Sequence, residues 1–459
     1  MRSLRRLIAL NIIIFSFAPV IGQDNAVLAG PMLGQVELRT ARIWIEAGKN
    51  AKSASVRYWK KSAPTNSLTK PIPGDYIREF KTARVEIGGL EMNTTYGYEI
   101  LVNGISSKKT GEFTTKDLWQ WRKPAPDFSF LTGSCAYFND PIYDRPGKPY
   151  GGDSSIFETM AKEPAAFMLW LGDNWYTREA DYYSEWGLWY RASHDRSLPV
   201  LQPFWKAMSQ YAIWDDHDYG PNDADKTFFL KDASRNIFMN YWANPSYGQD
   251  GEAVYSKLSY SDCDFFLMDD RWYRSADDME PLVDGKPNPD KRMWGKKQMD
   301  WLKNALVFSK ANFKFIVTGS QSLNTVSPVD CLQHYPIEFN ELIEFLKEEK
   351  VNGVLFLTGD RHHSEIIRYD RADAYPLYDI TSSPLTSGVS RVSNEGNKEK
   401  DLPSRVNGTL VEAQNYTRIS VNGKSKERIL KVEFIGIKGD KLSEWSLSEK
   451  GLILPDVKK

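Results

Sequence analysis

Polar and apolar residues alternate along the first quarter of the chain, in short runs separated by turn-forming residues. The alternation predicts β-strands at residues 40–46, 53–59, 83–87 and 96–100. Three turn sequences separate these runs, namely Gly48-Lys49-Asn50, Pro71-Ile72-Pro73-Gly74 and Asn103-Gly104. Short strands at this spacing are typical of a two-sheet sandwich. We therefore predict an all-β domain of immunoglobulin or fibronectin type III character over residues 23–118.

From Phe128 onward the pattern changes to continuous apolar runs, which predict strands buried on both faces, as in α/β proteins. Between these runs, helix-patterned stretches predict covering helices at residues 154–163, 298–306 and 337–349. The chain returns to β patterning after about residue 410, where Asn422-Gly423 and Lys438-Gly439-Asp440 predict hairpin turns. We therefore predict an α/β domain over residues 127–459, joined to the sandwich by a Pro-containing linker at residues 119–126.

Five of the apolar runs end in polar residues that could carry chemistry. These strand ends are Gly133-Ser134-Cys135, Gly172-Asp173, Asp215-Asp216-His217-Asp218, Gly319-Ser320-Gln321 and Gly359-Asp360-Arg361-His362-His363. Taken singly, each cluster is more often a turn than a site. Ligands of α/β sheets, however, bind beyond the carboxyl ends of the strands. Together these ends would bring thiolate, carboxylate, phenolate, amide and imidazole donors to one place, and that combination predicts a metal site.

The first 22 residues have the pattern of a secretory signal peptide. Arg2, Arg5 and Arg6 precede an apolar stretch that ends at Val20, and the small residue Gly22 follows. The paired arginines admit a twin-arginine route, but a full twin-arginine consensus is missing, so we favour the general secretory route. No other stretch reaches the roughly 18 apolar residues that a membrane span needs. The sequence thus predicts a secreted or periplasmic protein without a transmembrane span.

The overall charge is close to neutral, since 59 lysines and arginines face 60 aspartates and glutamates among 459 residues. A chain so balanced lacks the broad basic field that nucleic-acid binding requires, and we expect no specific nucleic-acid recognition. The three cysteines, Cys135, Cys263 and Cys331, are too few and too widely spaced for a disulfide scaffold. A free cysteine is usually a small buried hydrophobe. Cys135 has the better claim to a function because it belongs to one of the strand ends.

Three of the strand-end blocks resemble motifs of calcineurin-like metallophosphoesterases, written G-D-x-x-D/Y, G-N-H-D/E and G-H-x-H. The matching segments are Gly172-Asp173-Asn174-Trp175-Tyr176, Trp214-Asp215-Asp216-His217-Asp218 and Gly359-Asp360-Arg361-His362. With Gly133-Ser134-Cys135, the segment 268–274 and the β-rich N-terminal domain, the sequence is similar to the PhoD-like alkaline phosphatase family over roughly residues 27–390. The resemblance implies a four-layer α/β/β/α core, in which a two-layer β-sandwich is covered by helices.

The resemblance also implies two cation sites with different donors. The first would hold ferric iron through Cys135, Asp173, Tyr176 and His362. Asp173 would bridge to a second site, formed with Asp216, Gln321 and Asp360. Oxygen-only sites favour calcium or magnesium over zinc or iron, and the resemblance favours calcium. Ser320 or Ser322 could take the place of Gln321 if the loop register is shifted.

Three further residues would act on the substrate. His217 follows a proposed ligand and would hydrogen-bond the phosphate or protonate the leaving oxygen. Arg271 would neutralise negative charge on the phosphoryl oxygens, because its planar fork of donors suits their geometry. The alternative for Arg271 is an ion pair with Asp269 or Asp270. His363 would either reach the phosphate or only pack beside the preceding histidine.

The resemblance therefore implies an exported phosphoric ester hydrolase of alkaline phosphatase type that acts on small-molecule phosphate esters. Hydroxide held by the metals would attack phosphorus, since a bound metal lowers the pKa of water toward neutrality. The same metal pair could instead cleave phosphodiesters or phospholipids, as in a phospholipase-D-like enzyme. A non-catalytic surface or carbohydrate-binding protein is an alternative from another class, suggested by the β-sandwich and the aromatic richness. Such a protein has no need for Cys, Asp, Tyr and His at matched strand ends.

Overall fold

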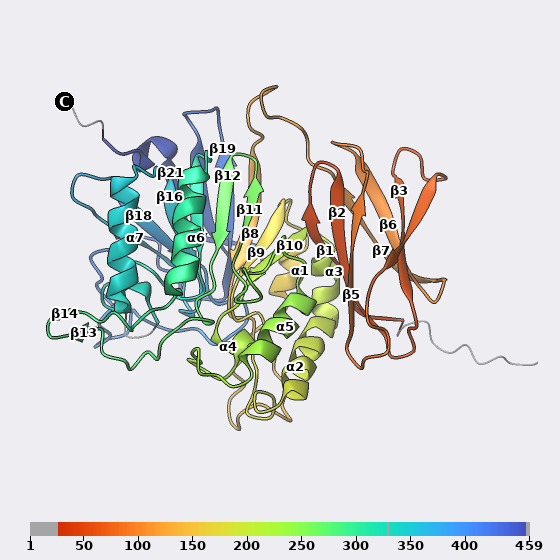
Figure 1. Ribbon diagram of the computed structural model, residues 1–459, viewed down its shortest axis with the longest axis horizontal. Coiled ribbons are helices and arrows are strands. Elements are labelled where there is room, and N and C mark those ends of the chain that lie inside the picture. The colour runs from red at the N-terminus through yellow and green to blue at the C-terminus, as the bar shows by residue number, and fades with distance from the viewer. Residues whose placement is uncertain (1–25, 328–329, 456–459) are drawn as a thin grey trace, which may run out of the picture.

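The computed structural model describes residues 26–327 and 330–455 of the chain. The predicted signal peptide, residues 1–22, lies outside these ranges. Within them, no helix has both the length and the apolar character needed to cross a membrane. Figure 1 shows a β-sandwich at the N-terminal end, drawn in red and orange, beside a larger unit of sheets and helices.

The N-terminal sandwich consists of a three-stranded and a four-stranded antiparallel sheet. Its strands are β1 (Val27–Val36), β2 (Thr40–Ala47), β3 (Ala54–Lys60), β4 (Ser67–Ile72), β5 (Lys81–Gly88), β6 (Thr95–Val102) and β7 (Ile105–Thr114). The sheet orders are β1-β2-β5 and β4-β3-β6-β7. Along β5 every second residue is buried, because one face packs into the sandwich and the other faces outward. The four predicted strands correspond to β2, β3, β5 and β6, and the predicted all-β sandwich is confirmed.

Two six-stranded mixed sheets form the centre of the larger unit. The first has the order β10 (Ser209–Ile213), β9 (Phe167–Leu171), β8 (Phe128–Gly133), β19 (Asn415–Asn422), β20 (Ile429–Gly436), β21 (Lys441–Ser448). The second has the order β11 (Ser256–Tyr260), β12 (Cys263–Leu267), β15 (Phe313–Val317), β16 (Val354–Thr358), β18 (Leu377–Thr381), β17 (Glu365–Tyr369). A separate hairpin pairs β13 (Leu282–Val283) with β14 (Lys286–Pro287).

Helices cover the outer faces of both sheets. They are α1 (Ile156–Met160), α2 (Glu185–Ser197), α3 (Gln202–Trp205), α4 (Asp216–Tyr219), α5 (Lys231–Tyr241), α6 (Gly295–Phe308) and α7 (Pro336–Glu348). Short 3₁₀ turns lie at η2 (Pro199–Leu201), η3 (Leu332–His334) and η4 (Glu449–Leu452). Consecutive residues of β8 enter different cores. Phe130 packs between the sheets, whereas Leu131 joins the cluster under α1, α2, α3 and α5. This burial of both faces explains the continuous apolar runs, and the predicted four-layer α/β/β/α core is confirmed.

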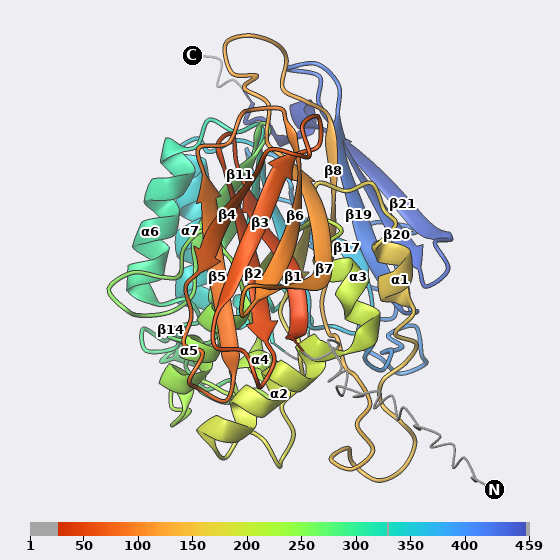
Figure 2. The same ribbon diagram turned by 90° about the vertical axis from the view of Figure 1, so that its right-hand side faces the viewer.

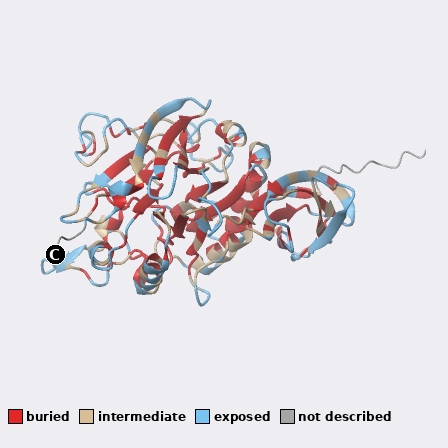
Figure 3. Ribbon diagram, turned by 90° about the horizontal axis from the view of Figure 1, so that it is seen from above, coloured by how far each residue is buried: buried red, intermediate tan, exposed pale blue. Residues whose placement is uncertain are grey.

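The N-terminal sandwich packs directly on the helical layer of the core, as Figure 2 shows with the sandwich toward the viewer. Trp44 of β2 lies in the same apolar cluster as the residues of α2 and α5, and its indole N–H donates to the Asn240 carbonyl at 2.6 Å. Glu46 of β2 is buried in the same interface and accepts a hydrogen bond from Ser193 Oγ at 2.7 Å. The two units therefore share a continuous interior, visible as adjoining red strands in Figure 3.

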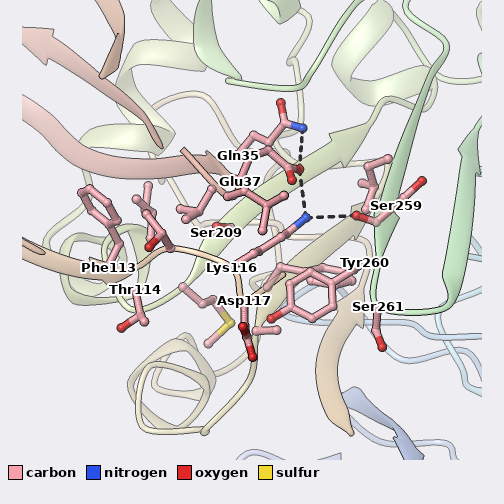
Figure 4. Close-up of a pocket in the computed structure, with 18 of the residues that line it drawn as sticks. Gln35, Glu37, Phe113, Thr114, Lys116, Asp117, Ser209, Ser259, Tyr260 and Ser261 are labelled. Carbon is pink, nitrogen blue, oxygen red and sulfur yellow. Dashed lines mark hydrogen bonds and ion pairs between the residues drawn. The ribbon is translucent and has the colours of Figure 1, made fainter. Parts of the chain in front are cut away.

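A cavity of about 780 Å³ lies between the sandwich and the core, at the amino ends of β9 and β10 (Figure 4). Lys116 bridges it, donating to Glu37 Oε1 at 2.9 Å and to the Ser259 carbonyl at 3.0 Å. The carboxyl ends of β9 and β10, where ligand binding is expected, lie at the opposite ends of the same strands. The cavity is thus separate from the predicted metal ligands.

Candidate metal centre

The predicted ligands converge because parallel strands end at one edge of each sheet. β8, β9 and β10 run parallel in the first sheet, and β12, β15 and β16 run parallel in the second. Glycines allow these ends to approach closely. A Cβ atom at Gly359 would lie 2.6 Å from Ser134 Cβ, and one at Gly172 would lie 2.5 Å from Asp215 Cβ. The glycine before each of the two aspartates Asp173 and Asp360 is therefore required by packing.

The first predicted donor set is assembled in the structure. Cys135 Sγ lies 3.6 Å from Asp173 Oδ2, and the Tyr176 hydroxyl donates to the same oxygen at 3.0 Å. The Tyr176 hydroxyl also lies 3.2 Å from Nε2 of His362. One ligand atom each from Cys135, Asp173 and His362 fits within a span of 4.8 Å. A thiol, a carboxylate, a phenol and an imidazole thus face one another inside the protein.

The backbone at these positions adopts a conformation that side chains other than glycine rarely take. φ is +64° at Cys135, +51° at Asp173, +66° at Asp360 and +57° at His362. Left-handed backbone in non-glycine residues costs energy and concentrates at functional sites. Four of the seven predicted metal ligands share it, so the strain aims their side chains toward a common centre.

The electrostatics of the first set indicate that the donors are arranged for a cation. Burial, then the negative charges of Asp173 and Asp360, raise the pKa of the Cys135 thiol well above its usual range. Burial and the nearby carboxylates likewise raise the pKa of Asp173, and burial with Asp173 and Cys135 raises that of Tyr176. In this buried site, the negative charge of one group therefore opposes the ionisation of its neighbours. A bound cation would reverse this balance, because its own charge is the largest in such a site.

The second predicted set is present in part. An oxygen of Asp173, an oxygen of Asp216 and a ring nitrogen of His217 fit within a span of 4.8 Å. Burial and the charges of Asp330 and Asp216 raise the pKa of Asp360 to about 7, so Asp360 belongs to the same electrostatic cluster. The His217 ring packs against Tyr176, with centroids 4.1 Å apart and ring planes tilted by 31°, and its Nδ1 is buried without a partner among the described residues. Burial lowers the pKa of His217, which favours a neutral imidazole.

Gln321 is committed to other contacts. Its Nε2 donates to Glu365 Oε1 at 2.8 Å and to Thr381 Oγ1 at 2.9 Å, while its Oε1 accepts from Arg361 at 2.6 Å and from Asn324 at 3.0 Å. All the capacity of the amide is used, so no oxygen lone pair is left for a cation. In the described part of the chain, the Ser320 and Ser322 hydroxyls are buried without partners. The contacts of Gln321 therefore speak against it as a ligand, and the serine alternative stays a prediction.

Arg271 is buried in an ion-pair cluster. Its Nε donates to Asp215 Oδ1 at 2.6 Å and its Nη2 to Asp330 Oδ2 at 2.6 Å, with the side chain 1% exposed. The alternative partners named from the sequence, Asp269 and Asp270, are wrong. Asp269 instead accepts from the backbone N–H of Arg271 at 3.0 Å and from the Trp214 indole at 2.7 Å. The sequence could not show this, because Asp215 follows β10 and Asp330 lies in the loop before η3, both far from Arg271 along the chain.

His363 is fully buried and its ring is surrounded by protein groups. Its Nδ1 lies 3.0 Å from the carbonyl oxygen of Arg361, and its Nε2 lies 3.3 Å from Glu365 Oε1. These contacts favour the packing alternative for His363 over contact with phosphate.

Two contributors to the centre were not singled out from the sequence. Asp218 accepts from the backbone N–H and from the side chain of Asn174, and thereby ties the loop after β9 to the loop after β10. Asp218 and Asn174 both lie within the sequence blocks that resemble the family motifs, so the motifs could have indicated this contact. Tyr150 lies in the long connection between β8 and α1, and its hydroxyl is 3.1 Å from His362 Nδ1. No motif surrounds Tyr150, and only the folded chain brings it to the centre.

The fold is the one that the motifs implied. The family model described as PhoD-like phosphatase matches residues 130–429, and the chain belongs to this family. Residues 24–115 match a second model, described as a domain of unknown function, DUF7800.

Similar proteins agree with this assignment. A protein named alkaline phosphatase D from Bacillus subtilis (strain 168) is 26% identical over 330 residues, which are 62% of this chain and 53% of that protein. The match thus spans about half the length of the relative. Among solved structures, "Structure of PhoD" superposes with a TM-score of 0.76 at 19% identity, covering 96% of this chain and 94% of that one. The purple acid phosphatase PPD1 from yellow lupin (Lupinus luteus) gives 0.63 at 11% identity, covering 91% and 74%. These two structures establish the shared fold.

Proposed function

We propose that the protein is an exported, metal-dependent phosphoric ester hydrolase of alkaline phosphatase type. The observation that carries the proposal is the pair of buried donor sets that share Asp173. Membership of the PhoD-like phosphatase family supports phosphohydrolase chemistry. The printed name of the Bacillus subtilis relative supports the alkaline phosphatase type.

The two donor sets would hold different cations. Thiolate and phenolate beside a carboxylate suit a highly charged ion, so ferric iron would bind through Cys135, Asp173, Tyr176 and His362. Oxygen donors suit calcium, which would bind through Asp173, Asp216 and Asp360, with Ser320 or Ser322 as a further oxygen. When bound, the cations would supply Lewis-acid activation of the phosphoryl group and of water.

The chain's own residues would bind the phosphate ester and handle the proton. His217 lies at the second donor set, its Nδ1 has no partner among the residues that the structure describes, and it would hydrogen-bond a phosphoryl oxygen or protonate the leaving oxygen. Arg271 would offset the charge of the substrate, since against the effect of burial the charges of His217 and of the Arg271 guanidinium lower the pKa of Asp216. Its ion pairs with Asp215 and Asp330 would hold it there.

Metal analysis and a substrate panel test the function together. We expect the purified full-length protein to contain iron close to one atom per chain. A calcium chelator should abolish activity reversibly, calcium should restore it better than zinc, and iron should stay bound. The panel compares para-nitrophenyl phosphate, bis-para-nitrophenyl phosphate and phospholipid vesicles, so that a phosphodiesterase or phospholipase would be recognised by its substrate.

Each result has a counterpart that would contradict the proposal. Restoration by zinc alone would overturn the calcium assignment of Asp216 and Asp360. A protein without stoichiometric metal and without activity on any ester would favour the non-catalytic alternative. Export is tested separately by sequencing the N-terminus of the protein recovered outside the cytoplasm, which should begin near Gln23.

A further inference from the structure

The histidine of the first donor set, His362, is held between two phenol groups. Its Nε2 lies 3.2 Å from the Tyr176 hydroxyl, inside the donor set. On the other side of the ring, Nδ1 lies 3.1 Å from the hydroxyl of Tyr150. Among the described residues, Tyr150 is the partner of Nδ1, and the position holds no carboxylate or backbone carbonyl.

A cation can bind His362 only through a nitrogen that carries no proton. A neutral imidazole has one protonated and one bare nitrogen, and the hydrogen bond at one nitrogen decides which is which. When the Tyr150 oxygen accepts a hydrogen bond from the protonated Nδ1, Nε2 is left bare and faces Cys135 and Asp173. If the hydroxyl were absent, nothing at Nδ1 would favour this tautomer over the one in which Nε2 is blocked.

The chain that directly follows Tyr150 is held by hydrogen bonds to two other segments. Asn139 and Gly151 exchange a pair of hydrogen bonds, with distances of 2.8 and 2.9 Å. The N–H of Gly152 donates to the Thr386 carbonyl at 2.6 Å. A Cβ atom at Gly388 would lie 3.0 Å from the Tyr150 ring, so the backbone there packs closely on it. The hydroxyl is therefore placed before any ligand arrives.

Two neighbouring aromatic rings also pack against the side chain of Tyr150, a residue that is 44% exposed. The Tyr137 ring meets it edge-on at 4.8 Å between centroids, and the Tyr176 ring does so at 6.3 Å. The Tyr137 hydroxyl points elsewhere, donating to Asp144 at 2.6 Å. Tyr137 and Tyr150 thus belong to one aromatic cluster, but of these two hydroxyls only that of Tyr150 contacts His362.

We propose that Tyr150 is a positioning residue that accepts a hydrogen bond from Nδ1 of His362 and so keeps Nε2 bare for the metal. The proposal rests on the metal dependence of the proposed function. Partners behind metal-binding histidines commonly change metal affinity by about 10-fold to 100-fold when they are removed. In this chain a phenol from a separate loop takes the place usually held by a carboxylate or a carbonyl.

The test compares Tyr150→Phe with Tyr137→Phe in the full-length protein. Each variant removes one hydroxyl and keeps its ring, and Tyr137→Phe is the matched control because its hydroxyl does not contact His362. Zn²⁺ serves as a diamagnetic probe that accepts thiolate and imidazole ligands. Its affinity is measured by competition with a chromophoric chelator, and the histidine tautomer by nitrogen NMR of ¹⁵N-histidine-labelled protein.

We expect Tyr150→Phe to bind Zn²⁺ about 10-fold to 100-fold more weakly than wild type, while Tyr137→Phe binds it as wild type does. In the wild type loaded with Zn²⁺, the His362 signals should show a protonated Nδ1, assigned by their loss in His362→Gln. Equal Zn²⁺ affinity in wild type and Tyr150→Phe would overturn the role of Tyr150 alone. A wild-type protein that binds no metal would overturn the proposed function instead.

Discussion

Glu46 offers a direct test of how the N-terminal sandwich is attached to the core. The carboxyl group comes from β2 and is 1% exposed, between Ser193 of α2 and Tyr241 of α5. Both hydroxyls donate to Oε1, at 2.7 and 3.1 Å, while Oε2 is buried without a partner among the described residues. Burial raises the pKa of Glu46 from 4.5 to about 7, against the opposing effect of these two hydrogen bonds. The carboxyl is therefore neutral at acidic pH and becomes a buried anion at alkaline pH.

The size of the stability change follows from the pKa of Glu46 in the unfolded state, 4.5, and in the folded state, about 7. Because the pKa is higher in the folded state, the stabilisation by Glu46 is complete below pH 4.5 and is lost as the pH rises through about 7. Each pH unit between the two values corresponds to about 1.4 kcal/mol, so ionisation destabilises the folded protein by about 3 kcal/mol. Glu46→Gln keeps an oxygen for Ser193 and Tyr241 and cannot ionise. The free energy of unfolding of Glu46→Gln should therefore not show the decrease that ionisation of Glu46 causes in wild type.

Urea unfolding followed by tryptophan fluorescence at pH 5 and pH 9 measures the effect. The free energy of unfolding of wild type should fall between these pH values by about 3 kcal/mol more than that of Glu46→Gln. Glu86→Gln is the control, since this carboxylate lies in the same sheet but is 50% exposed beside Arg42. Glu86→Gln should follow the wild-type pH profile. Parallel profiles for wild type and Glu46→Gln would refute the assignment of a buried, titrating carboxyl at this interface.

Three further predictions concern the metal centre and the core. Cys135→Ala should lose iron and activity together, measured by elemental analysis and ester hydrolysis, because it removes a thiolate donor; unchanged metal content would return Cys135 to a packing role. His217→Asn should keep both metals and slow turnover about 100-fold to 10,000-fold. The slowing should be greater for an alkyl ester than for para-nitrophenyl phosphate if His217 is the acid, and metal loss would instead identify a ligand. Glu338→Gln should lower the free energy of unfolding, measured with urea, by about 1.5–3 kcal/mol. The reason is that this carboxylate accepts hydrogen bonds from three backbone N–H groups at the start of α6. The metal content of the variant should equal that of wild type.

Several strands with long apolar runs were recognisable from the sequence, whereas β1, β12 and β18 were missed although most of their residues are buried. β9 and β15 are continuous apolar runs because both of their faces are covered, and they end within two residues of the predicted polar blocks at Gly172 and Gly319. β7 has mainly polar residues and few buried ones, so its sequence lacks a strand pattern. α2 was missed because it buries charged residues such as Arg191 and Arg196, which hide its inward face from a hydrophobicity pattern.

The sequence by itself determined which residue types stand at the strand ends, since the motif glycines and donors are local features of the chain. It therefore predicted the donor set of Cys135, Asp173, Tyr176 and His362, which the structure brings together. Only the tertiary structure decided the partners that come from distant segments. The ion pairs of Arg271, the hydrogen bonds that occupy Gln321 and the approach of Tyr150 to His362 depend on how loops from both sheets meet. The physical reason is that hydrogen bonds and ion pairs act over a few ångströms, and such distances between remote residues are set by packing.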